Sequence, residues 1–247
     1  MSRFQGRHVV ITGGSGGIGK ATAARVVAEG GRVLITGTNQ GKLDQARREI
    51  DGLIALVNDA GDPESAPALA AAVETHLGRV DGLFLNAGYG EMVSHDQVTA
   101  AQFDRQFAVN VRGPILQVRA LAGLLTEGAA IVLNTSVVQE IGMPGGILYG
   151  ASKAALRNVT RVLAAEMAPK VRVNAVSPGP VSTDFFARTG LPEEQTAALA
   201  QGILSQVALQ RFGQPGEIAS AAAFLLSADA SFMTGSELVV DGGITQV

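Results

Sequence analysis

The stretch that decides the fold is Thr12-Gly13-Gly14-Ser15-Gly16-Gly17-Ile18-Gly19. Its first residue, Thr12, is the last residue of the apolar run Val9–Thr12, and a segment with helical periodicity follows it. Glycines at such a junction let the turn close, let the backbone approach a pyrophosphate, and let strand and helix pack tightly. The helix N-terminus then presents unpaired N–H groups and the positive end of its dipole to the phosphates. The stretch therefore predicts a dinucleotide site, and the alternative is a plain tight turn.

Short apolar runs rich in β-branched residues recur along the chain and alternate with segments of helical period. The runs are Val9–Thr12, Val33–Ile35, Ile54–Val57, Leu83–Leu85, Ala130–Leu133, Val171–Val176 and Leu238–Val240. Strands that are apolar on both faces suit a parallel sheet covered by helices on each side. The sequence predicts a single-domain α/β fold of the Rossmann type, a doubly wound sheet of seven mainly parallel strands with helices on both faces.

Local signals refine this prediction. Asp62-Pro63 places a good N-cap before a proline at the first helical position. Thr99 and Gln102 have the spacing of a capping box. Segment 115–125 is apolar nearly all round, which predicts a subunit interface. Segment 182–212 fits neither period cleanly, and we expect it to form a mobile flap over a site.

Composition narrows the classes of function. No linker, charge run or repeat divides the 247 residues, so we expect one domain spanning residues 1–247. A net charge of -3 argues against nucleic acid and anionic membranes as partners. The chain has no cysteine, and its three histidines (His8, His76, His95) lack metal-ligand spacing, so no metal site is expected. No apolar run suits a membrane span and no signal peptide precedes the first strand, which favours a cytoplasmic protein.

Tyr149-Gly150-Ala151-Ser152-Lys153 is predicted to begin a helix, where i,i+4 spacing puts the phenol and the ammonium on one face. A free tyrosine has a pKa of about 10 and is a poor proton shuttle at neutral pH. We expect the nearby cation to favour the phenolate and to lower the pKa of Tyr149 into the useful range. The alternative is a coincidental pair of surface residues.

Ser136 stands where catalytic groups gather in open α/β sheets, beyond the carboxyl end of a strand. The run 130–133 leads into Asn134-Thr135-Ser136. The Ser136 hydroxyl can donate to a carbonyl oxygen that becomes an alkoxide during reduction. A lone serine here would be an ordinary loop residue, so this prediction depends on Tyr149.

The spacing Gly13-x-x-x-Gly17-x-Gly19 resembles the glycine-rich turn of the short-chain dehydrogenase/reductase family, and Ser136 with Tyr149-x-x-x-Lys153 extends the resemblance along the whole chain. The resemblance implies NAD(P)(H)-dependent interconversion of a ketone and a secondary alcohol. In reduction, Ser136 and Tyr149 would bind the carbonyl oxygen, Tyr149 would donate a proton, and Lys153 would hold the nicotinamide ribose. The chain resembles secondary-alcohol dehydrogenases and carbonyl reductases, which implies a homotetramer.

Asn110 completes the expected catalytic set. It lies in a predicted helix, and Pro114, four residues later, cannot donate to its carbonyl. We expect the freed carbonyl to hold a water, which resembles the family's proton relay from Lys153 to bulk solvent. The alternative is a simple kink at Gly113-Pro114.

Further positions match the family's landmarks around the dinucleotide, among them Asn86-Ala87-Gly88 after the fourth strand and Pro178-Gly179 after the sixth. Leu85 departs from the pattern, because many members have a second asparagine there. The expected cofactor contacts are Gly13, Ser15, Gly17, Ile18, Gly19, Thr38, Asn39, Asp59, Ala60, Asn86, Ala87, Gly88, Tyr149, Lys153, Pro178, Gly179, Val181 and Thr183.

The choice between NADP(H) and NAD(H) depends on the segment after the second strand. Residues 36–40 contain no carboxylate to bind a ribose 2′-hydroxyl and repel a 2′-phosphate. The arginine that many NADP-using relatives carry near position 38 is absent, as is a basic residue at Gly16. Thr38, Asn39 and Lys42 can meet a phosphate with hydroxyl, amide and charge. We favour NADP(H), with NAD(H) as the alternative.

The expected pocket wall is mostly apolar and favours a small hydrophobic ketone or alcohol, although several of its residues could instead fill the core. Its residues are Val138, Ile141, Met143, Phe185, Phe186 and Leu191. An alternative is a 3-oxoacyl-[acyl-carrier-protein] reductase, which needs a basic docking patch; Glu127 weakens that reading, while Lys170 and Arg172 favour it. An alternative of another class is a non-catalytic, dinucleotide-sensing protein on the same fold.

Overall fold

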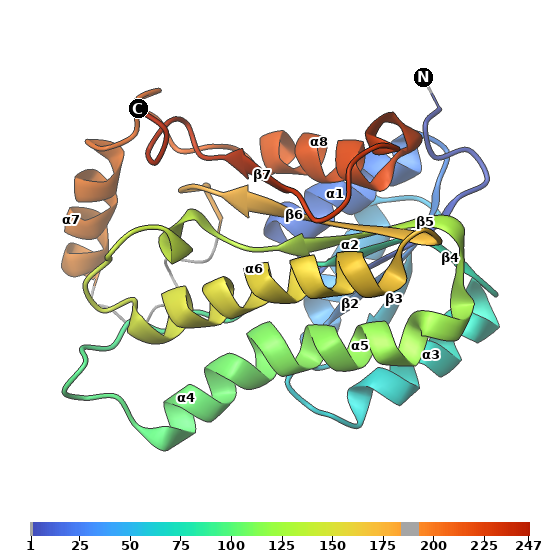
Figure 1. Cartoon of the computed structure of the whole chain (residues 1–247), viewed down its shortest axis with the longest axis horizontal. Helices are drawn as coiled ribbons and strands as arrows, with labels where there is room; N and C mark the ends of the chain where they lie inside the picture. Colours follow the sequence, from blue (N-terminus) through green and yellow to red (C-terminus); the bar gives the residue numbers. More distant parts are fainter. Residues whose placement is uncertain (1, 184–192) are drawn as a thin grey trace.

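A single seven-stranded parallel sheet forms the centre of the molecule, in the order β3-β2-β1-β4-β5-β6-β7 (Figure 1). This computed structural model describes residues 2–183 and 193–247. The strands are β1 (His8–Ile11), β2 (Arg32–Gly37), β3 (Ile54–Val57), β4 (Val80–Leu85), β5 (Leu125–Asn134), β6 (Val171–Pro178) and β7 (Glu237–Val240). Every strand pair is parallel, which confirms the predicted fold class.

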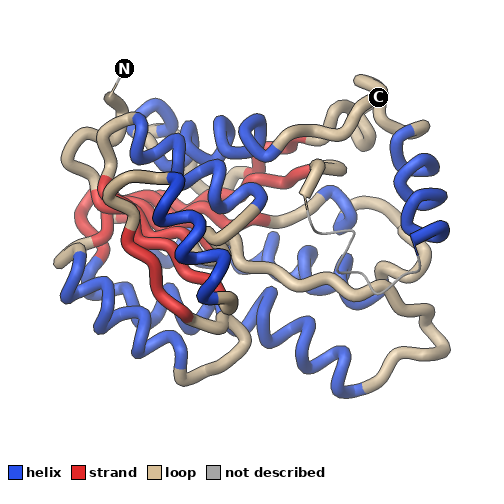
Figure 2. Tube along the Cα trace, turned by 180° about the vertical axis from the view of Figure 1, so that it is seen from behind, coloured by secondary structure: helices blue, strands red, loops and turns tan. Residues whose placement is uncertain are grey.

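Helices cover both faces of the sheet, as Figure 2 shows from behind. The α-helices are α1 (Gly17–Ala28), α2 (Gln40–Glu49), α3 (Ser65–His76), α4 (Ala100–Phe107), α5 (Gly113–Leu121), α6 (Ile147–Met167), α7 (Glu193–Leu204) and α8 (Pro215–Leu226). Short helical turns are η1 (Ala108–Arg112), η2 (Ala122–Leu124), η3 (Val137–Gln139) and η5 (Ala228–Ala230). None of the helices in the described residues is long and apolar enough to cross a membrane.

Two hydrophobic cores form because successive side chains of a strand point to opposite faces. Val9 and Ile11 of β1 pack into the core beneath α1, α2 and α8. Val10, between them, packs into the core beneath α3, α5 and α6. Burying both faces explains why the strands are continuously apolar rather than alternating.

The chain changes direction across the sheet at β1, whose neighbours are β2 and β4. Ligands of open α/β sheets bind at such a switch point, outside the carboxyl ends of the strands. The glycine-rich turn follows β1 at this point. Helix α7 stands beyond the carboxyl ends of β6 and β7 (Figure 1).

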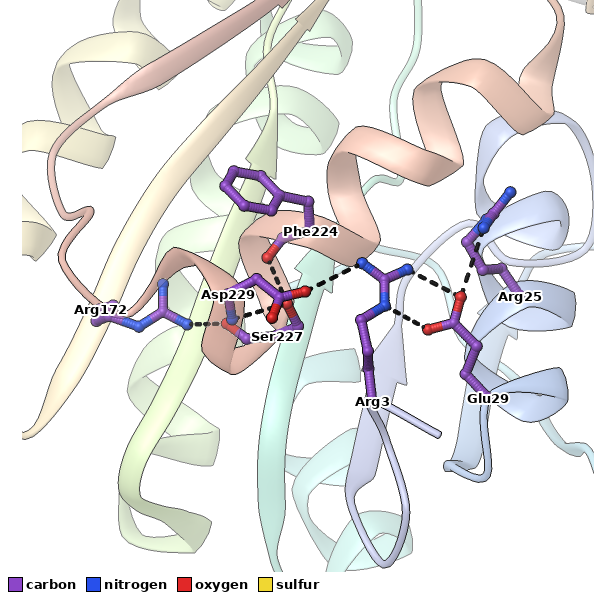
Figure 3. Close-up of polar contacts among 7 residues, drawn as sticks. All are labelled: Arg3, Arg25, Glu29, Arg172, Phe224, Ser227 and Asp229. Carbon is purple, nitrogen blue, oxygen red and sulfur yellow. Dashed lines mark hydrogen bonds and ion pairs between the residues drawn. The ribbon is translucent and has the colours of Figure 1, made fainter. Parts of the chain in front are cut away.

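Salt bridges tie the amino-terminal edge of the sheet together (Figure 3). Arg3 Nε donates to Glu29 Oε2 at 2.6 Å, and Arg3 Nη1 lies 3.6 Å from Asp229 Oδ2. Arg172, near the start of β6, donates to the carbonyls of Leu225 at 3.1 Å and Ser227 at 2.9 Å. Arg172 therefore binds the last carbonyls of α8, at the edge opposite the carboxyl ends of the strands.

Local predictions met different outcomes. The capping box of Thr99 and Gln102 is confirmed. Helix α3, in contrast, begins at Ser65 and not behind Asp62-Pro63. The Asp62 carboxylate accepts from the backbone N–H of Glu64 at 3.0 Å, so it closes a turn before the helix.

The other corrections concern the ends of segments. The helix expected over 115–125 stops at Leu121, because η2 turns the chain and Leu125 already pairs with Val80 as part of β5. Within 182–212 the structure contains α7, a helix that the sequence patterns missed. Three expected pocket residues, Phe185, Phe186 and Leu191, lie outside the described residues.

Candidate active site

The glycine-rich turn depends on close approach of backbone to backbone. Gly13 has a φ of +64°, and a Cβ there would lie 2.8 Å from the Cα of Ala87. A Cβ at Gly19 would overlap the carbonyl oxygen of Gly13. Only glycine lets β1, α1 and the segment after β4 meet this closely. The turn is thus more specialised than a plain connection between strand and helix.

The first turn of α1 fits the pyrophosphate of a dinucleotide. Gly16, the N-cap residue, has no side chain to accept from the N–H groups of that turn, and a Cβ at Gly16 would meet open space. Unpaired N–H groups at an open helix N-terminus suit an anion. Thr183 reaches the same turn, because its Cγ2 lies 3.3 Å from where a Cβ of Gly17 would stand.

Asn86 joins the glycine-rich turn to the strands beside it. Its Nδ2 donates to the carbonyls of Thr12 at 3.0 Å and Gly13 at 3.1 Å, and its Oδ1 accepts from Asn134 Nδ2 at 3.0 Å. The Thr12 hydroxyl accepts from the N–H groups of Asn86 and Ala87. The side chain of Asn86 therefore holds the turn in place.

Ser136, Tyr149 and Lys153 come together at the carboxyl end of β5. Ser136 is buried, and its Oγ accepts from Val138 N at 3.4 Å, which leaves the hydroxyl proton to be donated. A hydrogen bond joins the Ser136 and Tyr149 side chains. Lys153 Nζ lies 5.6 Å from the centre of the Tyr149 ring and donates to the carbonyl of Asn134 at 2.7 Å. Helix α6 thus presents the phenol and the ammonium on one face, as its spacing predicts.

The electrostatics of this group differ from the expectation. Burial raises the pKa of Tyr149 to about 12, and the hydrogen bond with Ser136 offsets only part of this rise. Burial also lowers the pKa of Lys153 to about 8. Desolvation disfavours both charged forms, and the Lys153 amine is directed at a carbonyl. In the protein without a bound cofactor, Lys153 therefore does not lower the pKa of Tyr149 toward neutrality.

Asn110 lies in η1, a π-helical turn that links α4 to α5, and the helical backbone continues from Arg112 into Gly113, the first residue of α5. Its side chain clamps the backbone of Tyr89: Oδ1 accepts from Tyr89 N at 2.8 Å and Nδ2 donates to Tyr89 O at 2.8 Å. Nδ2 also lies 3.0 Å from Ser152 Oγ, which donates to the carbonyl of Tyr149 at 2.8 Å. Asn110 thus connects the segment after β4 to the helix that carries Tyr149.

Tyr89 and Ser152 are members of this network that the sequence analysis missed. Ser152 is fully buried in α6. A serine inside a helix is common, and nothing near Ser152 in the sequence indicates its hydrogen-bond partner. The signal for Tyr89 was its position directly after Asn86-Ala87-Gly88. Neither partner of Asn110 could be inferred from spacing, because the contacts span 21 and 42 residues.

Four of the expected cofactor contacts, Thr38, Asn39, Asp59 and Ala60, lie beyond β2 and β3. Thr38 and Asn39 are exposed, and Asn39 Oδ1 accepts from Lys42 N at 2.9 Å, which makes Asn39 the N-cap of α2. Asp59 is also exposed, and its Oδ1 accepts from Gly61 N at 2.8 Å. Ala60, the next residue, is buried.

Three further expected cofactor contacts, Pro178, Gly179 and Val181, lie at and just beyond the end of β6. Gly179 N donates to the carbonyl of Val240 at 3.0 Å, and a Cβ at Gly179 would lie 2.6 Å from the Cα of Asp241. Pro178 ends β6, and Val181 is buried and bridged to Gly213. The closeness of the two strand ends explains why residue 179 is glycine.

The described part of the expected pocket wall borders a groove of ≈ 550 Å³. Val138, Ile141 and Met143 line it, together with Ala151 and Ala154 of α6. Ala151 and Ala154 are not on the i,i+4 row of Tyr149 and Lys153. The groove therefore adjoins α6 on a face other than the one that carries Tyr149 and Lys153.

Known proteins resemble this chain over its whole length. The family model described as enoyl-(acyl carrier protein) reductase matches residues 13–245. The 2-(S)-hydroxypropyl-CoM dehydrogenase 3 of Xanthobacter autotrophicus is 35% identical, over 100% of this chain and 99% of its own. The glucose 1-dehydrogenase of Gluconobacter oxydans is 34% identical, over 98% of this chain and 93% of its own.

A solved structure agrees with these relatives. The short-chain dehydrogenase/reductase, glucose/ribitol dehydrogenase, from Brucella melitensis superposes with a TM-score of 0.89 at 31% identity, covering 99% of each chain. The seven-stranded parallel sheet with helices around it accounts for this superposition in physical terms. The chain therefore belongs to the short-chain dehydrogenase/reductase family of oxidoreductases.

Proposed function

We propose that Tyr149 is the general acid and base of an NAD(P)(H)-dependent reaction that interconverts a ketone and a secondary alcohol. The observation that carries this proposal is the contact of Tyr149 with Ser136 beside Lys153, at the edge of the sheet where the glycine-rich turn lies. The relatives named above are dehydrogenases, which supports the reaction class.

Each side chain has a distinct part in the proposed step. The bound nicotinamide supplies the hydride in reduction and accepts it in oxidation. Ser136 and Tyr149 donate to the carbonyl oxygen, and Tyr149 passes its proton to that oxygen as it becomes an alkoxide. Lys153 binds the nicotinamide ribose. In oxidation, Tyr149 as phenolate takes the proton from the alcohol.

Asn110 has two proposed parts: its side chain positions neighbouring residues, and its backbone carbonyl takes part in the route for protons. Its side chain fixes Tyr89 and Ser152, as described above, and its backbone carbonyl belongs to the π-helical turn η1. We propose that this carbonyl binds a water on the path from Lys153 to solvent. A high-resolution structure with no ordered water near Lys153 Nζ would contradict this part.

We propose NADP(H) as the preferred cofactor, with NAD(H) as the alternative. Gly37 ends β2, and Thr38 and Asn39, which follow it, bring no carboxylate; Thr38 is exposed there. Lys42 lies in the first turn of α2, whose N-terminus favours an anion. The hydroxyl of Thr38, the charge of Lys42 and the helix dipole support a 2′-phosphate at this place.

The substrate we propose is a small hydrophobic ketone or alcohol, because the described residues of the expected pocket wall, Val138, Ile141 and Met143, are apolar and follow Ser136 closely in the chain. The alternative, a 3-oxoacyl-[acyl-carrier-protein] reductase, gains no support from Arg172. That guanidinium binds the end of α8 at the far edge of the sheet. Glu127 lies near the start of β5 and Lys170 directly precedes β6, so both are also at the amino-terminal edge of the sheet.

A substrate panel tests this proposal. Small aryl and alkyl ketones and a β-ketoacyl thioester would be offered with NADPH and with NADH. We expect the highest kcat/KM for a ketone with NADPH. A preference for the thioester would instead support the acyl-carrier alternative, and no turnover of any member would favour the dinucleotide sensor.

We also propose a homotetramer. Apolar side chains on α4, α5 and α6 are exposed: Phe103 is 46% exposed, Ile115 42% and Val162 45%. Phe103 stacks on Phe107 with ring centres 4.3 Å apart, which makes the patch continuous along α4. Such a patch favours burial against a second copy.

A further inference from the structure

Glu237, the first residue of β7, is a buried carboxylate whose two oxygens are both fully engaged. Its side chain is 10% exposed. Oε1 lies 2.6 Å from Thr135 Oγ1 and 2.9 Å from Gln139 Nε2. Oε2 lies 2.8 Å from the same Gln139 nitrogen and 3.1 Å from Arg157 Nε. Each oxygen thus meets two donors, which matches the two lone pairs it offers.

Two of these donors flank Ser136. Thr135 precedes it, and Gln139 ends the η3 turn that Ser136 caps. The Thr135 hydroxyl also lies 3.0 Å from the carbonyl of Val176, but a carboxylate is the stronger acceptor for its single proton. Ser136 is therefore held from both sides by one carboxylate that reaches across from β7.

The third donor belongs to the helix that carries Tyr149. Arg157 lies one turn beyond Lys153 on α6, and besides Glu237 its guanidinium binds the carbonyl of Gly235 at 3.2 Å. Its side chain is 16% exposed, so water screens the ion pair weakly. The same carboxylate consequently connects the Ser136 turn to α6.

We propose that Glu237 is a positioning residue for the reaction: it fixes the Ser136 hydroxyl relative to the Tyr149 phenol. This inference rests on the proposed role of Ser136. The carbonyl oxygen must meet both hydroxyls at once, and a shift of about 1 Å in such a group lowers a rate by roughly 100-fold. Among the described residues, the hydrogen-bond and ion-pair partners of the Glu237 carboxylate are Thr135, Gln139 and Arg157, so it acts through the geometry of others.

The test is the Glu237→Gln variant, which keeps the shape but turns an amide N–H₂ toward two donors. With the ketone best reduced in the panel, we expect kcat to fall roughly 10- to 100-fold. The dissociation constant for NADPH, measured by fluorescence titration, should stay unchanged. The matched control is Glu29→Gln, because Glu29 also pairs with an arginine in a largely buried ion pair, at the opposite edge of the sheet. That control should lower the melting temperature and leave kcat unchanged.

Ser136→Ala, measured in parallel, separates this inference from the function it rests on. Full activity of Ser136→Ala would remove the proposed role of Ser136 itself. A large loss in Ser136→Ala together with wild-type kcat in Glu237→Gln would overturn only the positioning role. An equal fall of kcat in Glu29→Gln would also overturn it, because the effect would then follow from lost stability.

A second variant covers the case in which Glu237→Gln does not fold. Thr135→Val removes one donor and keeps the ion pair of Glu237 with Arg157, so the fold should persist. We expect kcat to fall while NADPH binding persists. Wild-type kcat in a folded Thr135→Val protein would overturn the proposal.

Discussion

At the scale of single residues, the chemistry depends on a phenol in a buried setting. Because burial raises the pKa of Tyr149 to about 12, the protonated form dominates at neutral pH. That form is the acid that ketone reduction requires. Alcohol oxidation requires the phenolate, which is scarce under the same conditions. The two directions should therefore respond differently to pH.

We expect kcat/KM for alcohol oxidation to rise with pH by about tenfold per pH unit, up to the pKa that Tyr149 has in the complex with oxidised cofactor. The positive charge of an oxidised nicotinamide favours the phenolate, so the rise should end below pH 12. Steady-state rates measured between pH 6 and pH 10 would show it. A flat profile for oxidation would mean that no such base limits the reaction.

Thr38 is the residue at which cofactor preference should change. In Thr38→Asp, a carboxylate would repel a 2′-phosphate and accept from a 2′-hydroxyl. We expect the ratio of kcat/KM for NADH to that for NADPH to rise at least about tenfold, because like charges in contact cost several kcal/mol. Exposed Thr75 on α3 serves as the control through Thr75→Asp. An unchanged ratio in Thr38→Asp would refute the placement of the 2′-phosphate.

At the scale of elements, the glycine-rich turn is the part whose sequence requirements follow most directly from distances. A Cβ at Gly19 would overlap the Gly13 carbonyl, whereas a Cβ at Gly123, in η2, would meet open space. Gly19→Ala should therefore push α1 away from β1, and overpacking of this kind costs about 1–3 kcal/mol. We expect NADPH affinity to fall roughly 10- to 100-fold.

Gly123→Ala, in η2 and away from the glycine-rich turn, is the matched control and should bind NADPH as the wild type does. Isothermal titration with both variants compares them directly. Equal affinities for Gly19→Ala and Gly123→Ala would show that the tight packing of the turn is irrelevant to binding.

Elements with strong local patterns were predictable from sequence, whereas their ends were not. The apolar runs Val9–Thr12 and Val171–Val176 became strands because burial on both faces decides their conformation. The ends depended on tertiary contacts. Leu125, expected at the end of a helix, instead pairs with Val80 in the sheet. The Asp62 carboxylate accepts from Glu64 N within a turn and does not cap α3.

At the scale of the whole molecule, the site joins residues that the sequence separates widely. The expected residues Ser136, Tyr149 and Lys153 do meet, because strands ending at one edge bring their loops together. The supporting residues Tyr89, Ser152 and Glu237 were not predicted. Their contacts span up to 102 residues, and no periodicity or spacing encodes them.

The outward apolar patch of α5 and α6 predicts the effect of charge on assembly. In the double variant Ile115→Glu, Val162→Glu, carboxylates would be buried without partners at a subunit contact, which costs several kcal/mol. We expect the mass measured by light scattering to fall from that of a tetramer to that of a smaller species. Ala28→Glu, on the exposed side of α1, should leave the mass unchanged. A tetramer that survives the double variant would place the interface elsewhere.

The most direct test of the central claim is the Tyr149→Phe variant, measured for both turnover and cofactor binding. Loss of the phenolic proton should lower kcat by roughly 100- to 10,000-fold, the usual contribution of general acid–base catalysis. The glycine-rich turn is untouched, so the dissociation constant for NADPH should match that of the wild type. Turnover within a few-fold of wild type, with NADPH binding intact, would contradict the assignment of Tyr149 as the acid and base.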